Sequence, residues 1–445
     1  MSKQEPVSVA ISTFLAQFFS QRSSSKAPST DHSQSFTIAL SGGADSVALL
    51  HAISSQYPKD KLKAIYINHQ LQAVSDEWAD FCQSLCQELD VDFEVIAVEL
   101  DQKAASLENS ARKARYQAFS KIIDSEQCLL TGHHQDDQAE TLLLQLFRGA
   151  GPKGLSAMPY ITSFAEGYHA RPLLSVSKVE VLEYCKEHQL SFVDDPSNLD
   201  TQHRRNFVRH RVIPLLEQEW PQLTATLSRV SQLQADTQAI VEERAQEDWE
   251  SCYTEGKGLS VEVLRKLSEV RQNSLIRYWF ERLGLGMPSV RVLKQLLSQM
   301  LEAETDAQPM IEFKQGSIRR HQDHLVWLPQ HSSSNHSSSN HSSSNHIKLQ
   351  DTAWNGKKDL QVADGITITA EWLKTHYPEL MGESLVVSLR RGGERFRKKN
   401  ARQSTSLKNY LQEQKFPAWQ RDQLLLIKLN DEVRAVYSEH LKGFI

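Results

Sequence analysis

Long apolar runs and paired cysteines are what this sequence lacks. No stretch approaches the ~20 apolar residues that a helix needs to cross a bilayer, and the first 20 residues have no basic head followed by an apolar core. The five cysteines are an odd number and include no Cys-x-x-Cys pair, which argues against a disulfide framework. We therefore expect a cytoplasmic protein that does not contact a membrane.

A large excess of charge is also missing. The formal net charge is −5 over 445 residues, so bulk electrostatics do not indicate a nucleic-acid-binding protein. Any RNA contact must come from local basic patches. Cys82 and Cys86 lie four residues apart on a predicted helix and share a face. They could form a metal or redox pair, although two small buried hydrophobic side chains are the simpler interpretation.

Strand and helix patterns alternate through the first half of the chain. Strands are predicted at 36–40, 61–68, 93–100 and 128–131, and helices at 47–53, 76–89, 107–123 and 135–147. Single helices between successive strands predict parallel pairing with right-handed crossovers. The predicted fold class is therefore α/β, with a doubly wound parallel sheet in the N-terminal domain, a helical middle domain and a small α+β C-terminal domain.

The predicted domain boundaries follow changes in composition. Residues 1–220 would form the α/β domain, 221–328 the helical domain and 347–445 the C-terminal domain. Between the last two lies segment 329–346, which contains three copies of His-Ser-Ser-Ser-Asn. Its histidines could bind metal. Serine and asparagine dominate, however, and nothing apolar can be buried, so a low-complexity linker is predicted.

A glycine-rich segment follows the first predicted strand and precedes a helix. It consists of Ser41, Gly42, Gly43, Ala44, Asp45 and Ser46. Two glycines let the backbone turn sharply towards an anion, and the helix that follows offers unpaired N–H groups and the positive end of its dipole. The segment therefore predicts a pyrophosphate site. It is not a Walker loop, because the Gly-Lys-[Ser/Thr] ending is absent.

The segment Ser-Gly-Gly-Ala-Asp-Ser resembles the PP-loop of the N-type ATP pyrophosphatases. The resemblance implies an adenine nucleotide alpha hydrolase-like fold that uses ATP. In this family the loop holds the departing pyrophosphate while AMP is transferred to a substrate oxygen. The alternative is a glycine-rich turn between a strand and a helix that binds no ligand.

Further segments resemble the lysidine synthases within this family. They are Tyr66-Ile-Asn-His-Gln-Leu71, Glu108-Asn-Ser-Ala-Arg-Lys-Ala-Arg-Tyr116, Thr131-Gly-His-His-Gln-Asp-Asp-Gln-Ala-Glu-Thr141, Arg148-Gly-Ala-Gly-Pro-Lys-Gly-Leu155, Asp194-Asp-Pro-Ser-Asn198 and Arg204-Arg-Asn-Phe-Val-Arg-His-Arg211. The resemblance covers nearly the whole chain. The His-Ser-Ser-Ser-Asn repeat is not part of the family pattern.

The resemblance implies roles for residues at the ends of the strands. Asn68 and His69 would meet the base or ribose of ATP, although a structural asparagine is the alternative. Arg112 would hold phosphate with its planar fork. Two solvated arginines, Arg112 and Arg115, are the alternative there.

A cluster of carboxylates and imidazoles follows the fourth predicted strand. Asp137 and Glu140 lie three residues apart and would project towards ATP, with His133 beside them. Carboxylates there can hold Mg²⁺ against the phosphates, bind the charged amines of lysine, or take a proton from an attacking amine. We expect Mg²⁺ at Asp45 and Asp137. Stabilisation of the helix dipole alone could also explain these carboxylates.

Two basic segments predict contacts to RNA phosphates. The first contributes Arg205 and Arg209, for which a salt-bridged helix face is the alternative. The second lies in the C-terminal domain and contributes Arg391, Arg395, Arg397, Lys398 and Lys408. An ordinary solvated loop is its alternative.

The resemblance implies ligation of L-lysine to C2 of the wobble cytidine of the isoleucine tRNA with a CAU anticodon, through an adenylated cytidine. The change would switch codon reading from AUG to AUA and identity from Met to Ile. A PP-loop tRNA thiolase is the leading alternative, but of the five cysteines only Cys128 lies near the predicted site. A glutamine-fed synthetase and an inactive RNA-binding module are weaker alternatives. A homodimer is compatible with this interpretation, although the sequence does not fix the oligomeric state.

Overall fold

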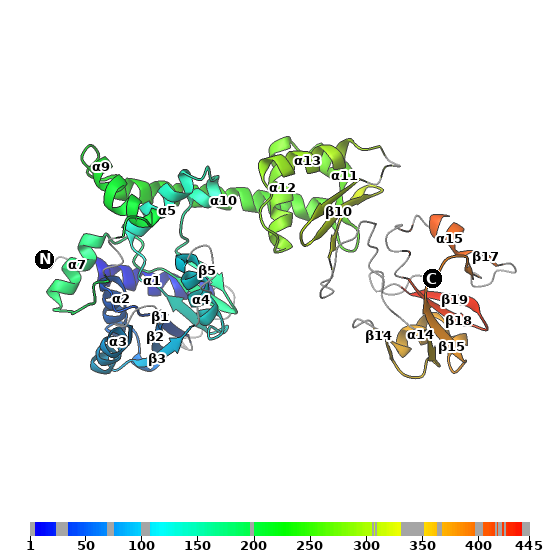
Figure 1. Cartoon of the computed structure of the whole chain (residues 1–445), viewed down its shortest axis with the longest axis horizontal. Helices are drawn as coiled ribbons and strands as arrows, with labels where there is room; N and C mark the ends of the chain where they lie inside the picture. The colour runs from blue at the N-terminus through cyan, green and yellow to red at the C-terminus, as the bar shows by residue number, and fades with distance from the viewer. Residues whose placement is uncertain are drawn as a thin grey trace. The chain divides into compact units, whose positions relative to one another are not determined.

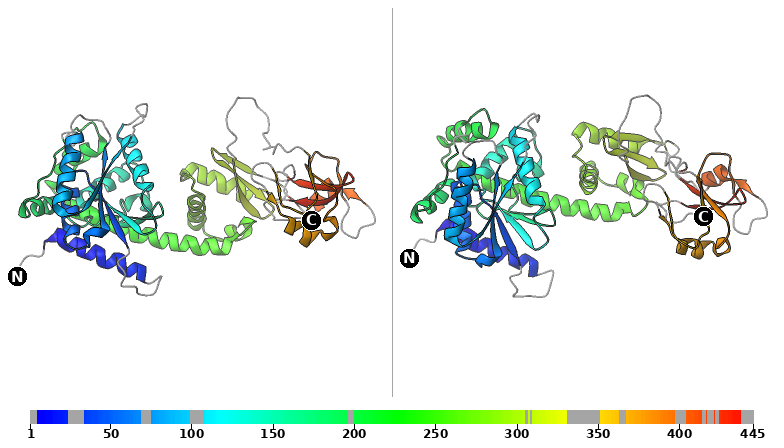
Figure 2. Two further views of the ribbon diagram at one scale, coloured as in Figure 1. Left: turned by 90° about the horizontal axis from the view of Figure 1, so that it is seen from below. Right: turned by 60° about the horizontal axis from the view of Figure 1, so that its bottom comes forward.

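The computed structural model describes residues 5–23, 34–68, 75–98, 107–195, 200–304, 307, 309–330, 351–362, 367–396, 404–413, 416, 421 and 424–437. Its internal contacts divide the chain into two units, residues 1–241 and 242–445. Figures 1 and 2 show both units in ribbon form. The predicted His-Ser-Ser-Ser-Asn linker, together with His69, Arg397 and Lys398, lies outside the described residues.

A six-stranded sheet forms the centre of the first unit, in the order β3-β2-β1-β4-β6-β5. Its strands are β1 (Ser35–Ala39), β2 (Leu62–Asn68), β3 (Asp92–Ala97), β4 (Gln127–Leu130), β5 (Ile161–Phe164) and β6 (Gly167–Ala170). Five of these strands run parallel, while β5 pairs antiparallel with β6. The predicted parallel sheet is confirmed, and the β5–β6 hairpin is an addition that the sequence did not predict.

Helices cover both faces of this sheet (Figure 1). They are α1 (Pro6–Ser23), α2 (Ala44–Ser54), α3 (Ser75–Leu89), α4 (Leu107–Ser120), α5 (Gln135–Leu146), α6 (Pro152–Leu155) and α7 (Lys178–Glu187), with a 3₁₀ turn, η1, at Lys59–Lys61. Side chains of α1, α2, α3 and α7 pack on one face, which carries Leu62, Ala64 and Tyr66 of β2. The side chains of α4 pack on the other face, against Ile65 and Ile67. The alternation along β2 therefore produces the doubly wound arrangement.

A helical segment with one π-helical turn follows the sheet and its helices in the first unit. It consists of α8 (Arg204–Phe207), η3 (Val208–Val212) and α9 (Ile213–Glu217). Leu143 of α5 packs against Val208 and Ile213, which fixes this segment beside the helix that follows β4. The long helix α10 (Leu223–Cys252) begins in the first unit and ends in the second.

The second unit contains more β-structure than the sequence predicted. Helices α11 (Val261–Lys266), α12 (Glu269–Arg282) and α13 (Val290–Glu302) share a core with a five-stranded sheet, β7-β8-β11-β10-β9. The strands are β7 (Tyr253–Thr254), β8 (Gly258–Ser260), β9 (Met310–Phe313), β10 (Gly316–His321) and β11 (His324–Pro329). The predicted helical region is therefore present, and the structure adds a sheet to it.

The residues after 350 form the predicted α+β part. A six-stranded sheet has the order β12-β15-β18-β19-β16-β17, and β13 pairs with β14. The elements are β12 (Thr352–Trp354), β13 (Leu360–Gln361), β14 (Thr367–Ile368), α14 (Ala370–His376), η5 (Pro378–Leu380), β15 (Leu385–Leu389), β16 (Arg395–Phe396), β17 (Thr405–Ser406), α15 (Leu407–Glu413), β18 (Leu425–Leu429) and β19 (Glu432–Tyr437). Across the described ranges, no helix has the length and hydropathy required of a membrane span.

Candidate active site

The glycine-rich loop lies where the order of the strands reverses. Strands β1 and β4 are neighbours, and the chain leaves them towards opposite edges of the sheet. Ligands bind at such switch points in open α/β sheets, beyond the carboxyl ends of the strands. The loop at Ser41–Ser46 follows β1, and the His133–Asp137 segment follows β4. Strand pairing therefore brings the two strongest sequence motifs together.

Hydroxyl groups hold the loop in an open turn. Gly42 has φ +81°, and Gly43 is the N-cap of α2. The Ser46 Oγ accepts from the Ser41 amide at 3.1 Å and donates to the Gly43 carbonyl at 3.0 Å. The Ser46 amide donates to the Gly43 carbonyl at 3.1 Å, so the open amides at the start of α2, where its dipole is positive, are those of Ala44 and Asp45. These features suit an anion, and the binding of pyrophosphate by this loop stays a prediction.

Gly132 lets the β4 segment approach the loop closely. A Cβ at this position would lie 2.7 Å from the Asp45 carbonyl oxygen and 3.1 Å from the Ser46 amide nitrogen. Both atoms belong to the backbone, so they cannot move aside as a flexible side chain could. Position 132 therefore requires glycine, because backbone packs directly on backbone there.

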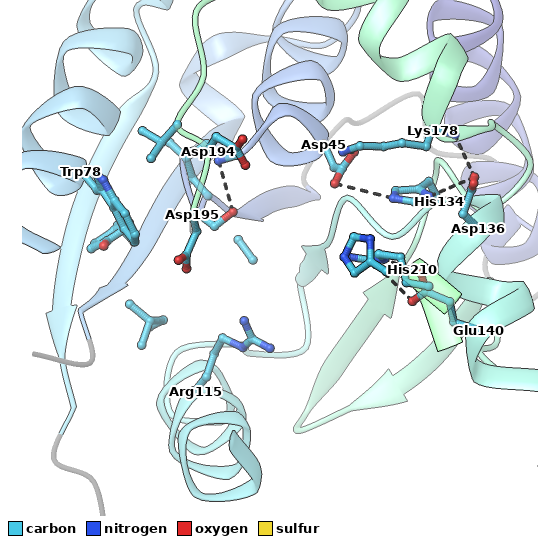
Figure 3. A pocket seen from close by; sticks show the side chains of 18 of the residues that line it. Asp45, Trp78, Arg115, His134, Asp136, Glu140, Lys178, Asp194, Asp195 and His210 are labelled. Carbon is cyan, nitrogen blue, oxygen red and sulfur yellow. Dashed lines mark hydrogen bonds and ion pairs between the residues drawn. The ribbon is translucent and has the colours of Figure 1, made fainter. Parts of the chain in front are cut away.

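A cavity of about 760 Å³ opens beside the loop. Figure 3 shows side chains from several elements around it, with Trp78 and Arg115 on one side and Asp45, His134 and Lys178 on the other. Six carboxylate residues line it, namely Asp45, Asp136, Glu140, Asp194, Asp195 and Glu217. The lysines and arginines in the lining are Arg115, Lys178 and Arg209. The cavity is thus rich in negative charge although it adjoins a loop that we predict to bind an anion.

Asp45, a residue of the loop, takes part in a series of ion pairs. The Lys178 Nζ donates to its Oδ1 at 2.7 Å, and the His134 Nε2 lies 3.7 Å from its Oδ2. His134 also lies 3.4 Å from a carboxylate oxygen of Asp136 and of Asp137. Burial on its own would lower the pKa of His134, but Asp136, Asp137 and Asp45 together raise it. The loop is therefore bordered by a cationic lysine and a histidine that favours its charged form.

The donors around Asp45 fit Mg²⁺ better than those around Asp137. Mg²⁺ is usually held by one or two carboxylates together with phosphate oxygens and water. Asp45 is 30% exposed, so its carboxylate can reach such an ion. The Oδ1 of Asp137 already accepts from both Arg205 and Arg209 at 3.0 Å. Among the described residues, no three His, Cys, Asp or Glu side chains form a ready-made metal cluster.

Arg205 and Arg209 bind two of the three carboxylates of α5, those of Asp137 and Glu140. The Arg205 Nε donates to the Glu140 Oε2 at 2.7 Å, and the Arg209 Nε donates to the Glu140 Oε1 at 2.5 Å. Glu140 is 1% exposed. Burial on its own would raise the pKa of Asp137, but His134, Arg205, His133 and Arg209 lower it to about 2. The two arginines that we predicted to bind RNA phosphates thus pair with Asp137 and Glu140.

A second series of hydrogen bonds joins the end of β4 to the end of β6 and includes residues that the sequence did not indicate. The Oγ1 of Thr131 bonds the Nδ1 of His133 at 2.8 Å and the Nε2 of His169 at 2.9 Å. The His169 Nδ1 lies 3.2 Å from the Arg171 NH2. Burial, aided by nearby arginines, lowers the pKa of His133 and of His169 to about 3. Both imidazoles are therefore neutral near pH 7.

The other predicted site residues are placed as follows. Arg112 is exposed, with its guanidinium 5.0 Å from the ring centre of Tyr116, while Arg115 lines the cavity. Asn68 is buried at the end of β2 and donates to Asp76 Oδ1 at 3.0 Å. Its role towards ATP stays a prediction.

In the second unit, the predicted RNA-contacting residues lie in and beside the last sheet. Arg391 bonds Asp351 at 2.6 Å, and Arg395 donates to the Ser404 hydroxyl at 2.9 Å. Lys408 lies exposed on α15. Their contacts to RNA stay a prediction.

Lys178 is the site residue that the sequence could have revealed. It is the first residue of α7, directly after Ser177, which is the N-cap of that helix. Its backbone amide donates to Asp136 Oδ2 at 2.8 Å. His169 and Arg171 carry no such local signal, because they reach the site through the pairing of β6 with β4.

Comparison with known proteins identifies relatives along most of the chain. Three family models match: a PP-loop domain at residues 11–216, a TilS substrate binding domain at 259–326 and a TilS substrate C-terminal domain at 385–438. The tRNA(Ile)-lysidine synthase of Coxiella burnetii is 34% identical over 411 residues, which covers 90% of this chain and 88% of that protein. The enzyme of the same name from Legionella pneumophila strain Paris is 33% identical and covers 90% of each chain. That from Proteus mirabilis is 37% identical over 66% of this chain and 67% of its own.

Replacing Gly132 by alanine should displace the phosphate loop. The new Cβ cannot fit 2.7 Å from the Asp45 carbonyl oxygen, so the backbone must move, and we expect a loss of more than about 2 kcal/mol in the free energy of unfolding. Gly43→Ala is the matched control. Its Cβ would meet Ser41 Oγ at 3.6 Å, an ordinary contact. Thermal unfolding of both variants measures the difference, and equal midpoints would contradict the close packing at position 132.

The lowered pKa of Asp137 predicts a specific loss of stability in acid. Its carboxylate stabilises the fold above the ordinary value of 3.8, and this contribution is lost as the pH falls through about 2. The free energy of unfolding of Asp137→Asn should therefore fall less between pH 4 and pH 2 than that of the wild type, by about 2 kcal/mol. Urea unfolding across this range measures it, with Asp60→Asn in the exposed turn η1 as control. Parallel curves for wild type and Asp137→Asn would contradict the prediction.

Proposed function

Because the chain belongs to the tRNA(Ile)-lysidine synthase family, we propose that it ligates L-lysine to C2 of the wobble cytidine of the isoleucine tRNA with a CAU anticodon. ATP is converted to AMP and pyrophosphate in the reaction. The family models and the full-length relatives support this function. We place the reaction in the cytoplasm. Assembly into a homodimer stays a prediction.

The charge of the cavity is the observation that carries the proposal. A phosphate-binding loop adjoins a cavity with six carboxylate residues, which favours cations beside the nucleotide. Free lysine carries two ammonium groups and one carboxylate at neutral pH. Glu140 and Arg209 both line the cavity and are paired with each other, so groups of both signs are available to such a substrate.

The first step adenylates the cytidine. The loop at Ser41–Ser46 binds the β- and γ-phosphates through the amides at the start of α2. The O2 of the cytidine attacks the α-phosphorus, and the bond to pyrophosphate breaks. Lys178, which lies at the mouth of the loop, is placed to offset the negative charge of the departing pyrophosphate. Mg²⁺ bound beside Asp45 would supply further charge neutralisation there.

The second step attaches lysine. The side-chain amine attacks C2 of the adenylated cytidine, the C2–O2 bond breaks, and AMP departs with that oxygen while the amine loses a proton. Asp137 is poorly suited to accept this proton, because its lowered pKa makes it a weak base. The buried carboxylates of Asp137 and Glu140 are better suited to fixing the charged groups of lysine, with Arg205 and Arg209 holding them in place.

The thiolase alternative is not favoured. The five cysteines are buried, and burial raises the pKa of Cys82 and of Cys86 to about 12, which leaves almost no reactive thiolate. Cys128, which the sequence placed near the site, lies within β4 with no exposed surface. The relatives that cover 90% of the chain carry the name of lysidine synthases, not of thiolases.

Label from [¹⁴C]lysine should enter tRNA only in the presence of ATP. The assay incubates the full-length protein with labelled lysine, ATP and bulk tRNA, and measures label in the RNA fraction. Omission of ATP and replacement of lysine by [¹⁴C]ornithine are the controls. If no ATP-dependent label appears in RNA, the proposed function is wrong.

Asp45→Ala should abolish AMP release while tRNA binding survives. The carboxylate at the phosphate loop is lost, whereas the predicted RNA-binding residues Arg391, Arg395 and Lys408 are untouched. AMP release is followed by chromatography and tRNA binding by gel shift. Asp60→Ala, in the exposed turn η1, is the matched control and should match wild type. AMP release by Asp45→Ala at the wild-type rate would show that the site is wrongly assigned.

A further inference from the structure

A continuous line of hydrogen bonds connects the interior of the sheet with His133. It starts at Arg171, whose NH1 donates to the Pro159 carbonyl at 2.7 Å and whose NH2 contacts the His169 Nδ1 at 3.2 Å. It continues from the His169 Nε2 to the Thr131 Oγ1 at 2.9 Å and from there to the His133 Nδ1 at 2.8 Å. Arg171, His169 and Thr131 are all less than 10% exposed. The chain of contacts is therefore shielded from water up to His133.

The chemistry of the groups gives this line a direction. A guanidinium has donors and no acceptor, so the Nδ1 of His169 must accept from Arg171 and cannot carry a proton. The proton of His169 then resides on Nε2, which donates to the Thr131 hydroxyl. That hydroxyl has a single hydrogen, and a buried hydroxyl hydrogen without an acceptor is costly. It therefore points to the His133 Nδ1, the remaining partner of Thr131.

His133 consequently accepts at Nδ1 and carries its own proton at Nε2. Among the residues that the structure describes, none accepts a hydrogen bond from this Nε2. His133 follows Gly132, which packs on the Asp45 backbone, and precedes His134, which lines the cavity. In the sequence, His133 thus lies between a residue that packs on the phosphate loop and a residue that lines the cavity.

We infer that Arg171, His169 and Thr131 are positioning residues that fix His133 in its neutral Nε2–H tautomer, so that His133 donates a hydrogen bond to an oxygen of the bound nucleotides and does not act as a base. The donor role rests on the proposed function, whereas the tautomer does not. Negative charge develops on phosphoryl oxygens as pyrophosphate and then AMP depart, and a preorganised donor stabilises such charge.

The tautomer is measured directly by nitrogen NMR. The full-length protein is labelled with [¹⁵N]histidine, and the His133 signals are identified by their absence in His133→Gln. The two ring nitrogens of a neutral imidazole have well-separated shifts, so the protonated one is recognised without any substrate. We expect protonation at Nε2. Protonation at Nδ1 would overturn the inference.

Substitutions at Thr131 test the positioning role. Thr131→Ser keeps the hydroxyl and should keep the pure Nε2–H signal. Thr131→Val is close in shape but has no hydroxyl, and it should give a mixture of tautomers. For Thr131→Val we also expect kcat for AMP formation to fall about tenfold with an unchanged KM for ATP. A pure Nε2–H signal in Thr131→Val would show that Thr131 does not set the tautomer.

Substitutions at His133 distinguish whether its side chain acts as a hydrogen-bond donor or as a base. The amide nitrogen of glutamine can replace the Nε2–H, whereas that of asparagine lies nearer the position of Nδ1. We expect His133→Gln to retain AMP formation within about tenfold of wild type and His133→Asn to lose roughly a hundredfold, as for removal of an oxyanion donor. Equal losses in both variants would contradict the donor role.

The outcomes also separate this inference from the proposed function. If the protein gives an Nε2–H signal but never transfers lysine to tRNA, the proposed function is wrong and the inferred tautomer of His133 is correct. If the protein ligates lysine to tRNA but gives an Nδ1–H signal, the proposed function is correct and the inferred tautomer is wrong.

Discussion

The parallel pairing of β1 with β4 is the constraint on which the site depends. Its register joins Phe36 to Cys128 and Ile38 to Leu130. The segments that follow β1 and β4 therefore leave the sheet at the same level, with the phosphate loop beside Gly132. A slip of one residue would turn every side chain of β4 to the opposite face. It would also move Gly132 from the Asp45 backbone, where no other residue fits.

The charges of the site are arranged around this junction. Asp137 and Glu140 are buried, and two arginines from a separate helical segment compensate them. Removing one partner from a buried network of this kind is expected to cost about 3–5 kcal/mol, because a charge is left without compensation. The network therefore ties the segment from α8 to α9 to α5. Arg209 lies in the π-helical turn η3, and such turns are frequent at functional sites.

Local patterns in the sequence were sufficient for the α/β fold and for the position of the phosphate loop. The strands predicted at 36–40, 61–68 and 128–131 lie within one residue of β1, β2 and β4, because each is a short buried apolar run bounded by polar residues. The five-stranded sheet β7-β8-β11-β10-β9 was not predicted, and two of its strands, β7 and β8, are only two and three residues long. Such strands carry no measurable periodicity.

Long-range contacts account for what the sequence could not reveal in the site. Arg205 and Arg209 have a spacing that suits RNA phosphates and carboxylates equally, so only the packing of η3 against α5 distinguishes the two. His169 joins the site from β6, some 36 residues beyond His133 in the sequence. Asp137 was assigned several roles, and its surroundings favour binding over proton transfer.

The same surroundings bear on how lysine would lie under the proposed function. A carboxylate whose pKa is lowered to about 2 remains charged and stabilises the ammonium form of any amine that it contacts. An ammonium group has no lone pair and cannot attack C2. The amine next to Asp137 is therefore better assigned to the α-ammonium of lysine, whose carboxylate can pair with Arg205 or Arg209. Under the proposed function the side-chain amine then extends into the cavity, whose carboxylates favour its charged form, so it must lose a proton before it attacks C2.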